Sequence, residues 1–139
     1  MKSNKSLFLV LSFCLLASLV NAQAITLVER IPLVEEPISV SIDRTDHIYL
    51  AGKKGNVYKY KNTGELLLTY SPQKPGRIKN VEAWSTLNIL VFYEGLQEFS
   101  FLNRFLTEIS TQKFNSDIYA RLATLSSDNN LWVFDDQDY

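Results

Sequence analysis

The sequence predicts an all-β protein, a partial β-propeller of about two and a half four-stranded antiparallel blades preceded by a single N-terminal closing strand. Two observations support this fold class. Short segments with alternating apolar and polar residues are separated by turn residues, as in strands with one buried face. The pattern also recurs: the step from Val40 to Val81 equals the step from Val81 to Leu122, and the step from Ile89 to Leu131 is longer by a single insertion. A four-strand unit with a period of about 40 residues is typical of a propeller blade. The alternative is a meander or sandwich with accidental spacing.

The first repeat, residues 37–71, is the clearest. Asp43 is expected to open a turn, because its carboxylate can accept hydrogen bonds from nearby backbone N–H groups. Gly64 is expected to adopt a positive φ in a second turn. The four expected strands are Ile38–Ile42, His47–Ala51, Val57–Tyr60 and Glu65–Tyr70.

The later repeats are degraded. Residues 78–114 keep the spacing but carry Trp84 in place of Asp43, and residues 119–139 stop after two strands. Trp84 is therefore expected near a blade tip and partly exposed. The residues expected to be buried between stacked sheets are Ile38, Val40, Ile42, Ile48, Leu50, Val81, Ile89, Val91, Leu122, Leu131 and Val133.

A single strand, Ile25–Leu33, precedes the first repeat. It is expected to occupy the fourth-strand position of a preceding blade, where such a strand closes a propeller ring. Because that blade and the rest of the third repeat are missing, the sequence predicts a fragment of a longer propeller. The expected arrangement is an open fan whose N-terminal strand is not closed onto the last blade.

Residues 1–22 are expected to be a signal peptide. Lys2 and Lys5 precede the apolar run Leu7–Val20, and small residues favour cleavage between Ala22 and Gln23. The run is short for a membrane span of roughly 20 residues, and Cys14 lies inside it rather than at a lipidation site. The sequence therefore predicts export to the periplasm, the cell surface or the medium, with no membrane span and no disulfide in the mature chain.

Composition and motifs argue against several chemistries. With 14 basic and 15 acidic residues the chain has no basic surplus, so a nucleic-acid partner is not expected. His47 is the only histidine, which is too few ligands for zinc and favours a structural role. Asp128 and the acidic residues at 135–138 are expected to be solvated rather than to hold calcium. No catalytic, metal or cofactor residue is assigned, and no cofactor is expected.

A candidate binding face follows from the strand order, which places the links between blades and the turns between second and third strands at one end. This face combines charges of both signs with aromatic rings, which suits a protein or glycan partner at the cell envelope. Its candidate residues are Lys53, Lys54, Lys74, Arg77, Trp84, Tyr93 and Glu94, with Glu35, Glu36, Asp135 and Asp136 at the same end.

The first repeat resembles an NHL-type propeller blade. The resemblance rests on the alternating strand Ile38–Ile42, Asp43, the aliphatic–aromatic–aliphatic Ile48–Leu50, the aromatic strand Val57–Tyr60 and the turn Asn62–Gly64. The chain also resembles exported propeller proteins of Bacteroidota, and it lacks the Gly-His and Trp-Asp pairs of WD repeats. The resemblance implies the fold alone. NHL-type enzymes hold a metal in the central channel through His, Asp, Glu or Asn, and this sequence shows no such set.

The function expected from these observations is that of an exported binding or scaffold module rather than an enzyme. One alternative is a fragment of a propeller enzyme of the lyase or lactonase type, whose catalytic residues lie in missing blades. The other is a structural module of a larger cell-surface protein.

Overall fold

The computed structural model describes residues 27, 29–74, 76–85, 87–128 and 130–135. The chain divides into two units, Met1–Ile31 and Pro32–Tyr139. In the first unit only Leu27 and residues 29–31 are described, so the predicted signal peptide lies outside the described residues. Everything that follows concerns the second unit.

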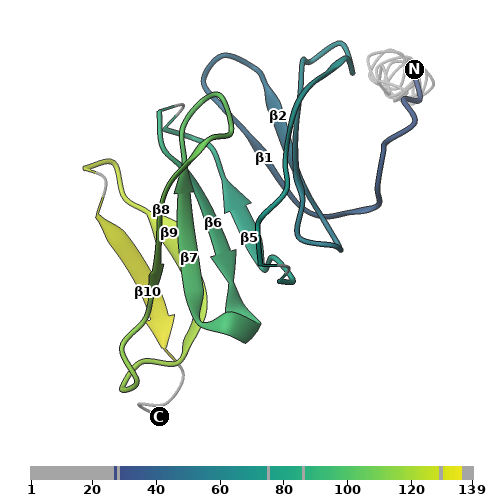
Figure 1. The fold of residues 1–139 in the computed structure, drawn as a ribbon. Helices are drawn as coiled ribbons and strands as arrows, with labels where there is room; N and C mark the ends of the chain where they lie inside the picture. The colour runs from purple at the N-terminus through teal and green to yellow at the C-terminus, as the bar shows by residue number, and fades with distance from the viewer. Residues whose placement is uncertain (1–26, 28, 75, 86, 129, 136–139) are drawn as a thin grey trace, which may run out of the picture. The chain divides into compact units, whose positions relative to one another are not determined.

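The described residues form three antiparallel sheets, two with four strands and one with two (Figure 1). Within each sheet, strands adjacent in sequence are paired. The all-β class is therefore confirmed. The first sheet contains β1 (Pro37–Ile42), β2 (Ile48–Gly52), β3 (Val57–Tyr60) and β4 (Leu66–Tyr70). The second contains β5 (Asn80–Glu82), β6 (Ile89–Tyr93), β7 (Glu98–Leu102) and β8 (Glu108–Lys113), and the 3-10 helix η1 (Glu94–Leu96) connects β6 to β7. The third contains β9 (Ala120–Leu125) and β10 (Leu131–Asp135).

The turns follow the chemistry that the sequence indicates. The Asp43 carboxylate accepts hydrogen bonds from the backbone N–H groups of Thr45 and His47, at 2.8 and 3.0 Å. Gly64 has the expected positive φ of 85°. In the second sheet Leu106 occupies the corresponding position with φ 58°, and its side chain is buried. Burial of that side chain offsets the cost of a conformation that glycine adopts more readily.

Each pair of successive sheets encloses one apolar cluster. Tyr49 and Val57 of the first sheet pack against Val81, Ile89 and Val91 of the second. On its other face, the second sheet packs against the third through a cluster built on Leu90, Phe92, Phe99, Ala123 and Leu125. Burying one such side chain contributes roughly 1.5–3 kcal/mol, so these two layers dominate the stability of the unit.

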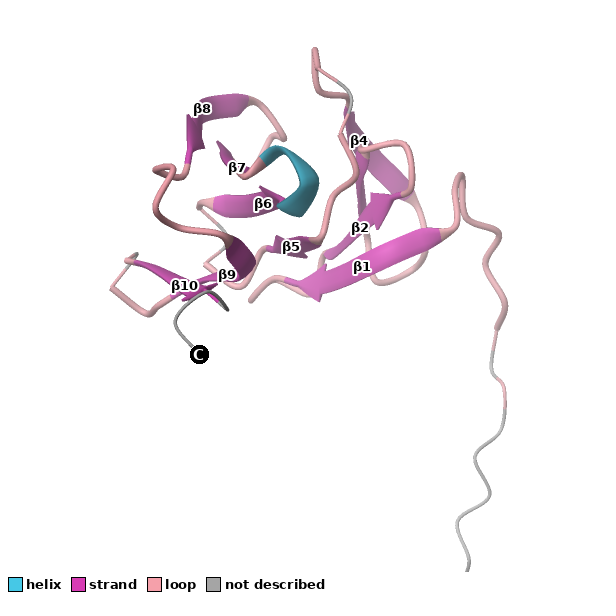
Figure 2. Ribbon diagram, turned by 90° about the horizontal axis from the view of Figure 1, so that it is seen from below, coloured by secondary structure: helices cyan, strands magenta, loops and turns pink. Residues whose placement is uncertain are grey.

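Polar side chains also join the first strands of successive sheets. The Ser39 and Ser41 hydroxyls accept hydrogen bonds from the N–H groups of Val81 and Ala83, at 3.1 and 2.9 Å. One sheet further on, the Glu82 carboxylate accepts from Leu125 N–H at 3.1 Å. Figure 2 shows β5 between β1 and β9, so each of these bonds joins neighbouring first strands. Because Glu82 lies one repeat after Ser41, the same position in the repeat joins both pairs of sheets.

Three of the predicted buried residues are exposed, and the prediction was wrong for them. Val40 and Ile42 are each 57% exposed because, among the described residues, no sheet covers the face of the first sheet on which they lie. Leu122 is 47% exposed, whereas its neighbour Ala123 is buried in the place that corresponds to Val81. The inserted residue therefore precedes β9, and the predicted register placed the wrong face inward, since neighbouring strand residues face opposite sides.

The predicted strand Ile25–Leu33 was also wrong wherever it can be compared. Leu27 and residues 29–33 have no strand structure, and Ile25, Thr26 and Val28 lie outside the described residues. A strand requires a ladder partner, and Pro32 has no N–H to donate. Val34 instead donates its N–H to the Tyr60 hydroxyl at 3.4 Å, so this segment is held by a side chain rather than a ladder.

Candidate functional site

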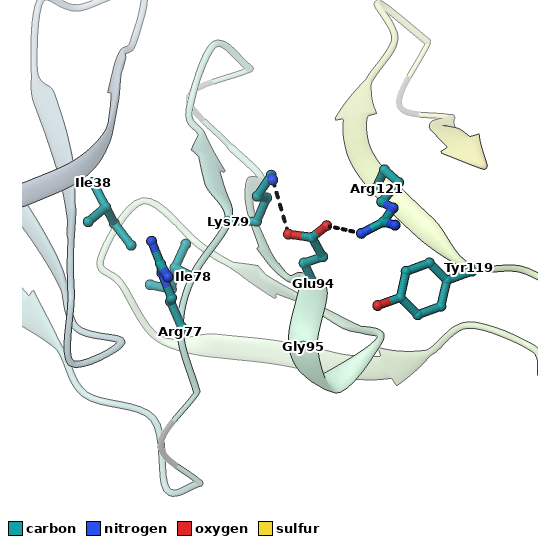
Figure 3. A pocket seen from close by; sticks show the side chains of 8 residues that line it. All are labelled: Ile38, Arg77, Ile78, Lys79, Glu94, Gly95, Tyr119 and Arg121. Atoms are coloured by element: carbon teal, nitrogen blue, oxygen red, sulfur yellow. Dashed lines mark hydrogen bonds and ion pairs between the residues drawn. The ribbon is translucent and has the colours of Figure 1, made fainter. Parts of the chain in front are cut away.

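A cavity of about 650 Å³ opens at the end of the sheets where the links between sheets run. It is lined by β1 of the first sheet, the link between β4 and β5, η1, and the start of the third sheet (Figure 3). We call it the cationic cavity, because three of its lining side chains carry a positive charge. Its lining residues are Ile38, Arg77, Ile78, Lys79, Glu94, Gly95, Tyr119 and Arg121.

The repeat explains why residues far apart in sequence meet here. Ile38, Lys79 and Arg121 follow one another at intervals of one repeat, so the three occupy one repeat position. Arg77 and Tyr119 each come two places earlier, before Lys79 and Arg121 respectively, and occupy a second shared position. Because β1, β5 and β9 lie next to one another, these two positions converge on one space.

Glu94 lies between two of the cations. Its Oε2 is 3.0 Å from Lys79 Nζ, and its Oε1 is 3.3 Å from Arg121 Nη1 (Figure 3). The hydrogen bond from Lys79, followed by that from Arg121, outweighs partial burial and lowers the pKa of Glu94. The carboxylate therefore stays ionised at neutral pH and holds both cations at the cavity wall.

Arg77 differs from the other two cations. Its side chain is exposed and makes no ion pair or hydrogen bond within the described part of the chain. Within the described lining, three cationic side chains thus face a single carboxylate. The arrangement suits an incoming anion, which would meet a guanidinium with all its donors available.

Gln97 fixes the position of Glu94. It adopts a left-handed conformation, with φ 50°, at the end of η1. Its side-chain Nε2 donates to the Glu94 carbonyl at 2.6 Å and to the Ala120 carbonyl at 3.0 Å. Its Oε1 accepts from Ala120 N–H at 2.7 Å. One amide side chain therefore ties η1 to the start of β9 and keeps the cavity wall in place.

The structure brings only part of the predicted binding face to this cavity, namely Arg77 and Glu94. Lys53 pairs with Glu36, and the backbone N–H of Lys54 donates to Glu35 at 2.8 Å, in a separate exposed group. Lys74 belongs to neither the cavity lining nor this group, and its Nζ lies 3.5 Å from the Glu98 carboxylate.

Two predicted face residues are misplaced. Tyr93 is 3% exposed and belongs to the cluster between the first two sheets, where burial raises the pKa of its phenol to about 12. Its ring fills the core because it is the last residue of a strand buried on both faces. Trp84 is 49% exposed, as expected, but it follows β5 at the opposite end of the strands from η1. The Arg44 guanidinium lies 4.1 Å from its ring centroid.

Sequence reasoning missed six of the eight lining residues of the cationic cavity: Ile38, Ile78, Lys79, Gly95, Tyr119 and Arg121. A signal for them existed in the repeat, because a cation recurs at the position shared by Lys79 and Arg121. It was not visible in the register used, which shifted the third repeat by one residue.

The other polar residues considered have local partners. His47 Nδ1 lies 2.8 Å from the Thr45 hydroxyl, in keeping with a structural role. Asp128 accepts from Asn130 at 2.6 Å and from Ser126 within its own turn. Among the residues described, no group of three or more His, Cys, Asp or Glu side chains is arranged to hold a metal ion. Asp136 and Asp138 lie outside that part of the chain.

Two comparisons with known proteins found no match. No protein-family model matches the chain, and no curated protein matches it significantly. In the described part of the chain, no helix has the length and apolar character needed to cross a bilayer.

Proposed function

We propose that this chain is an exported, NHL-type propeller module that binds an anionic group of a protein or glycan in its cationic cavity. The observation that carries the proposal is that the Arg77 guanidinium in this cavity has no partner among the described residues. The other two cations of the cavity, Lys79 and Arg121, are held by Glu94. The four-strand repeat and the recurring bonds between first strands support the propeller architecture.

The dimensions and chemistry of the cavity favour a carboxylate-bearing ligand. A volume of about 650 Å³ can hold a sugar residue or one or two side chains. A free guanidinium binds a carboxylate through two parallel hydrogen bonds. Tyr119 adds an aromatic ring with a hydroxyl to the wall. Because Glu94 and Gln97 already order the wall, little conformational entropy is lost on binding.

Calorimetric titration with paired ligands tests this proposal. An acidic oligosaccharide such as oligogalacturonate and a glutamate-rich peptide are compared with neutral oligogalactose and a glutamine-rich peptide. We expect at least one acidic ligand to bind and both neutral ligands to fail. A hydrogen bond to a charged group contributes about 1.5–3 kcal/mol, so Arg77→Gln should weaken binding by roughly tenfold or more.

Arg104→Gln is the matched control. Arg104 is an exposed arginine in the turn between β7 and β8, with its guanidinium 4.8 Å from the Phe105 ring centroid. The Arg104→Gln substitution removes the same charge as Arg77→Gln, but at the end of the strands opposite η1. Equal loss of affinity in both variants would show a general charge effect, and failure of every acidic ligand to bind would remove the proposal.

A further inference from the structure

Two apolar sheet faces lack a neighbouring sheet within the described residues. The leading face, on the first sheet, exposes Val40 and Ile42 of the edge strand β1 by 57% each, whereas Leu50, Tyr58 and Tyr60 on the middle strands of the same face are buried. The trailing face, on the third sheet, exposes Leu122, Trp132 and Phe134 by 47, 66 and 52%. Leu122 and Phe134 are paired across the strands, and Trp132 is the next residue on the same face of β10, so the trailing residues form one apolar patch. On the leading side the exposed residues Val40 and Ile42 are neighbours on β1. Contiguous apolar surface on a protein often marks an interaction site.

The repeat shows that these faces are the two halves of a junction that the chain already makes twice. Val40 corresponds to Val81 one repeat on, which is only 4% exposed because the first sheet covers it. Trp132 and Phe134 lie one repeat after Leu90 and Phe92, which are fully buried against the third sheet. The leading face thus carries side chains of the kind that the second sheet buries against the first. The trailing face carries side chains of the kind that the second sheet buries against the third.

The hydrogen bonds between sheets support the same correspondence. The N–H groups of Ala83 and Leu125 donate hydrogen bonds to the side-chain oxygens of Ser41 and Glu82 in the preceding sheet. In the edge strand β1, the corresponding N–H of Ile42 donates to no side-chain acceptor among the described residues. On the trailing side, Thr124 lies one repeat after Glu82 and also carries a side-chain oxygen, and its hydroxyl donates to Glu82 of the preceding sheet.

We propose that a second copy of this chain docks head to tail, with the trailing face of one copy packed on the leading face of the next. The contact continues the two junctions inside each copy and is heterologous, because the two faces differ. Such an interface closes into a ring when the rotation per copy permits and otherwise extends as a filament. The contact predicts that assembly depends on protein concentration and needs one intact face of each kind.

Sedimentation velocity of the full chain, from micromolar to millimolar concentration, tests the proposal. We expect species heavier than one copy to form as concentration rises. Ile42→Asp, which damages the leading face, and Trp132→Asp, which damages the trailing face, should each be monomeric alone. An equimolar mixture of the two should form a dimer, because it combines one intact trailing face with one intact leading face.

Ile109→Asp is the control. Ile109 is 58% exposed on β8, outside both faces, so this variant should assemble like the unmodified chain. Circular dichroism checks that each variant folds, and Val40→Asp replaces Ile42→Asp if that variant does not. A variant that still dimerises alone would show a like-to-like contact and overturn the proposal.

A chain that stays monomeric at every concentration would also overturn it. Hydrogen exchange in that monomer would then identify what occupies the leading face. Protected β1 amides would assign the face to the chain's own N-terminal segment, and unprotected amides would show that nothing in the monomer covers it.

Discussion

Replacing Asp43 with Asn should destabilise the first sheet, because this carboxylate organises the turn between β1 and β2. Asp43 is 4% exposed. It accepts hydrogen bonds from Thr45 and His47 backbone N–H groups at 2.8 and 3.0 Å, from the Thr45 hydroxyl at 2.7 Å and from the Tyr49 hydroxyl at 3.1 Å. Asn preserves the shape of the side chain but removes its charge and one acceptor atom.

The expected magnitude follows from these four bonds. Hydrogen bonds to a charged group contribute about 1.5–3 kcal/mol each and neutral ones about 0.5–1.5 kcal/mol. Thr45 is exposed and regains water, so the loss falls mainly on His47 N–H and on the fully buried Tyr49. We therefore expect Asp43→Asn to lower the free energy of unfolding by about 2 kcal/mol, which corresponds to roughly 6–12 °C in Tm for a domain of this size.

The effect should depend on pH with a defined sign. Burial alone would raise the pKa of Asp43, but the hydrogen bonds from Thr45, His47 and Tyr49 outweigh it and lower the pKa below its ordinary value. A carboxylate with a lowered pKa stabilises the fold above its unfolded pKa of about 4, and this contribution is lost as pH falls through its folded pKa. The difference between the unmodified chain and Asp43→Asn should therefore shrink as pH falls below about 4.

Urea unfolding of both proteins across this pH range measures the difference. Asp46→Asn in the same turn is the control, because Asp46 is exposed and Asn readily adopts its φ of 62°. We expect this control to change stability by less than about 0.5 kcal/mol. If Asp43→Asn changes stability no more than the control, or if the difference stays constant with pH, the role assigned to this carboxylate is wrong.

Three further predictions follow from the fold. Val81→Asp should abolish folding because it places a charge between two sheets, whereas Val40→Asp, at an exposed position, should retain the cooperative unfolding of a dilute sample; the same outcome for both would contradict the assignment of faces. Gly55→Ala should lower the free energy of unfolding by about 1–3 kcal/mol, because Gly55 has φ 89° and an added Cβ would collide with the Gly76 carbonyl oxygen. Gly95→Ala, whose Cβ would meet nothing within 4 Å, should leave chemical denaturation unchanged, and equal effects would remove this explanation. N-terminal sequencing of exported protein should begin at or near Gln23, and an uncleaved cytosolic chain would refute export.

The sequence by itself determined the local structure. Alternation with period two placed β1 to β4, and turn chemistry at Asp43 and Gly64 placed the bends, because these features depend on neighbours within a few residues. The same reasoning located eight strands in two repeats and two strands in the third.

Only the tertiary structure decided which face of each strand is buried. Val40 and Val81 have the same residue type and repeat position, yet one is exposed and the other buried, because within the described part of the chain only Val81 has a sheet against it. A one-residue shift likewise exchanged Leu122 for Ala123 in the core, since alternation alone does not fix where an insertion falls. The cationic cavity depends on the same packing. Its cations come from distant parts of the sequence and share one space only because the first strands of three sheets lie side by side.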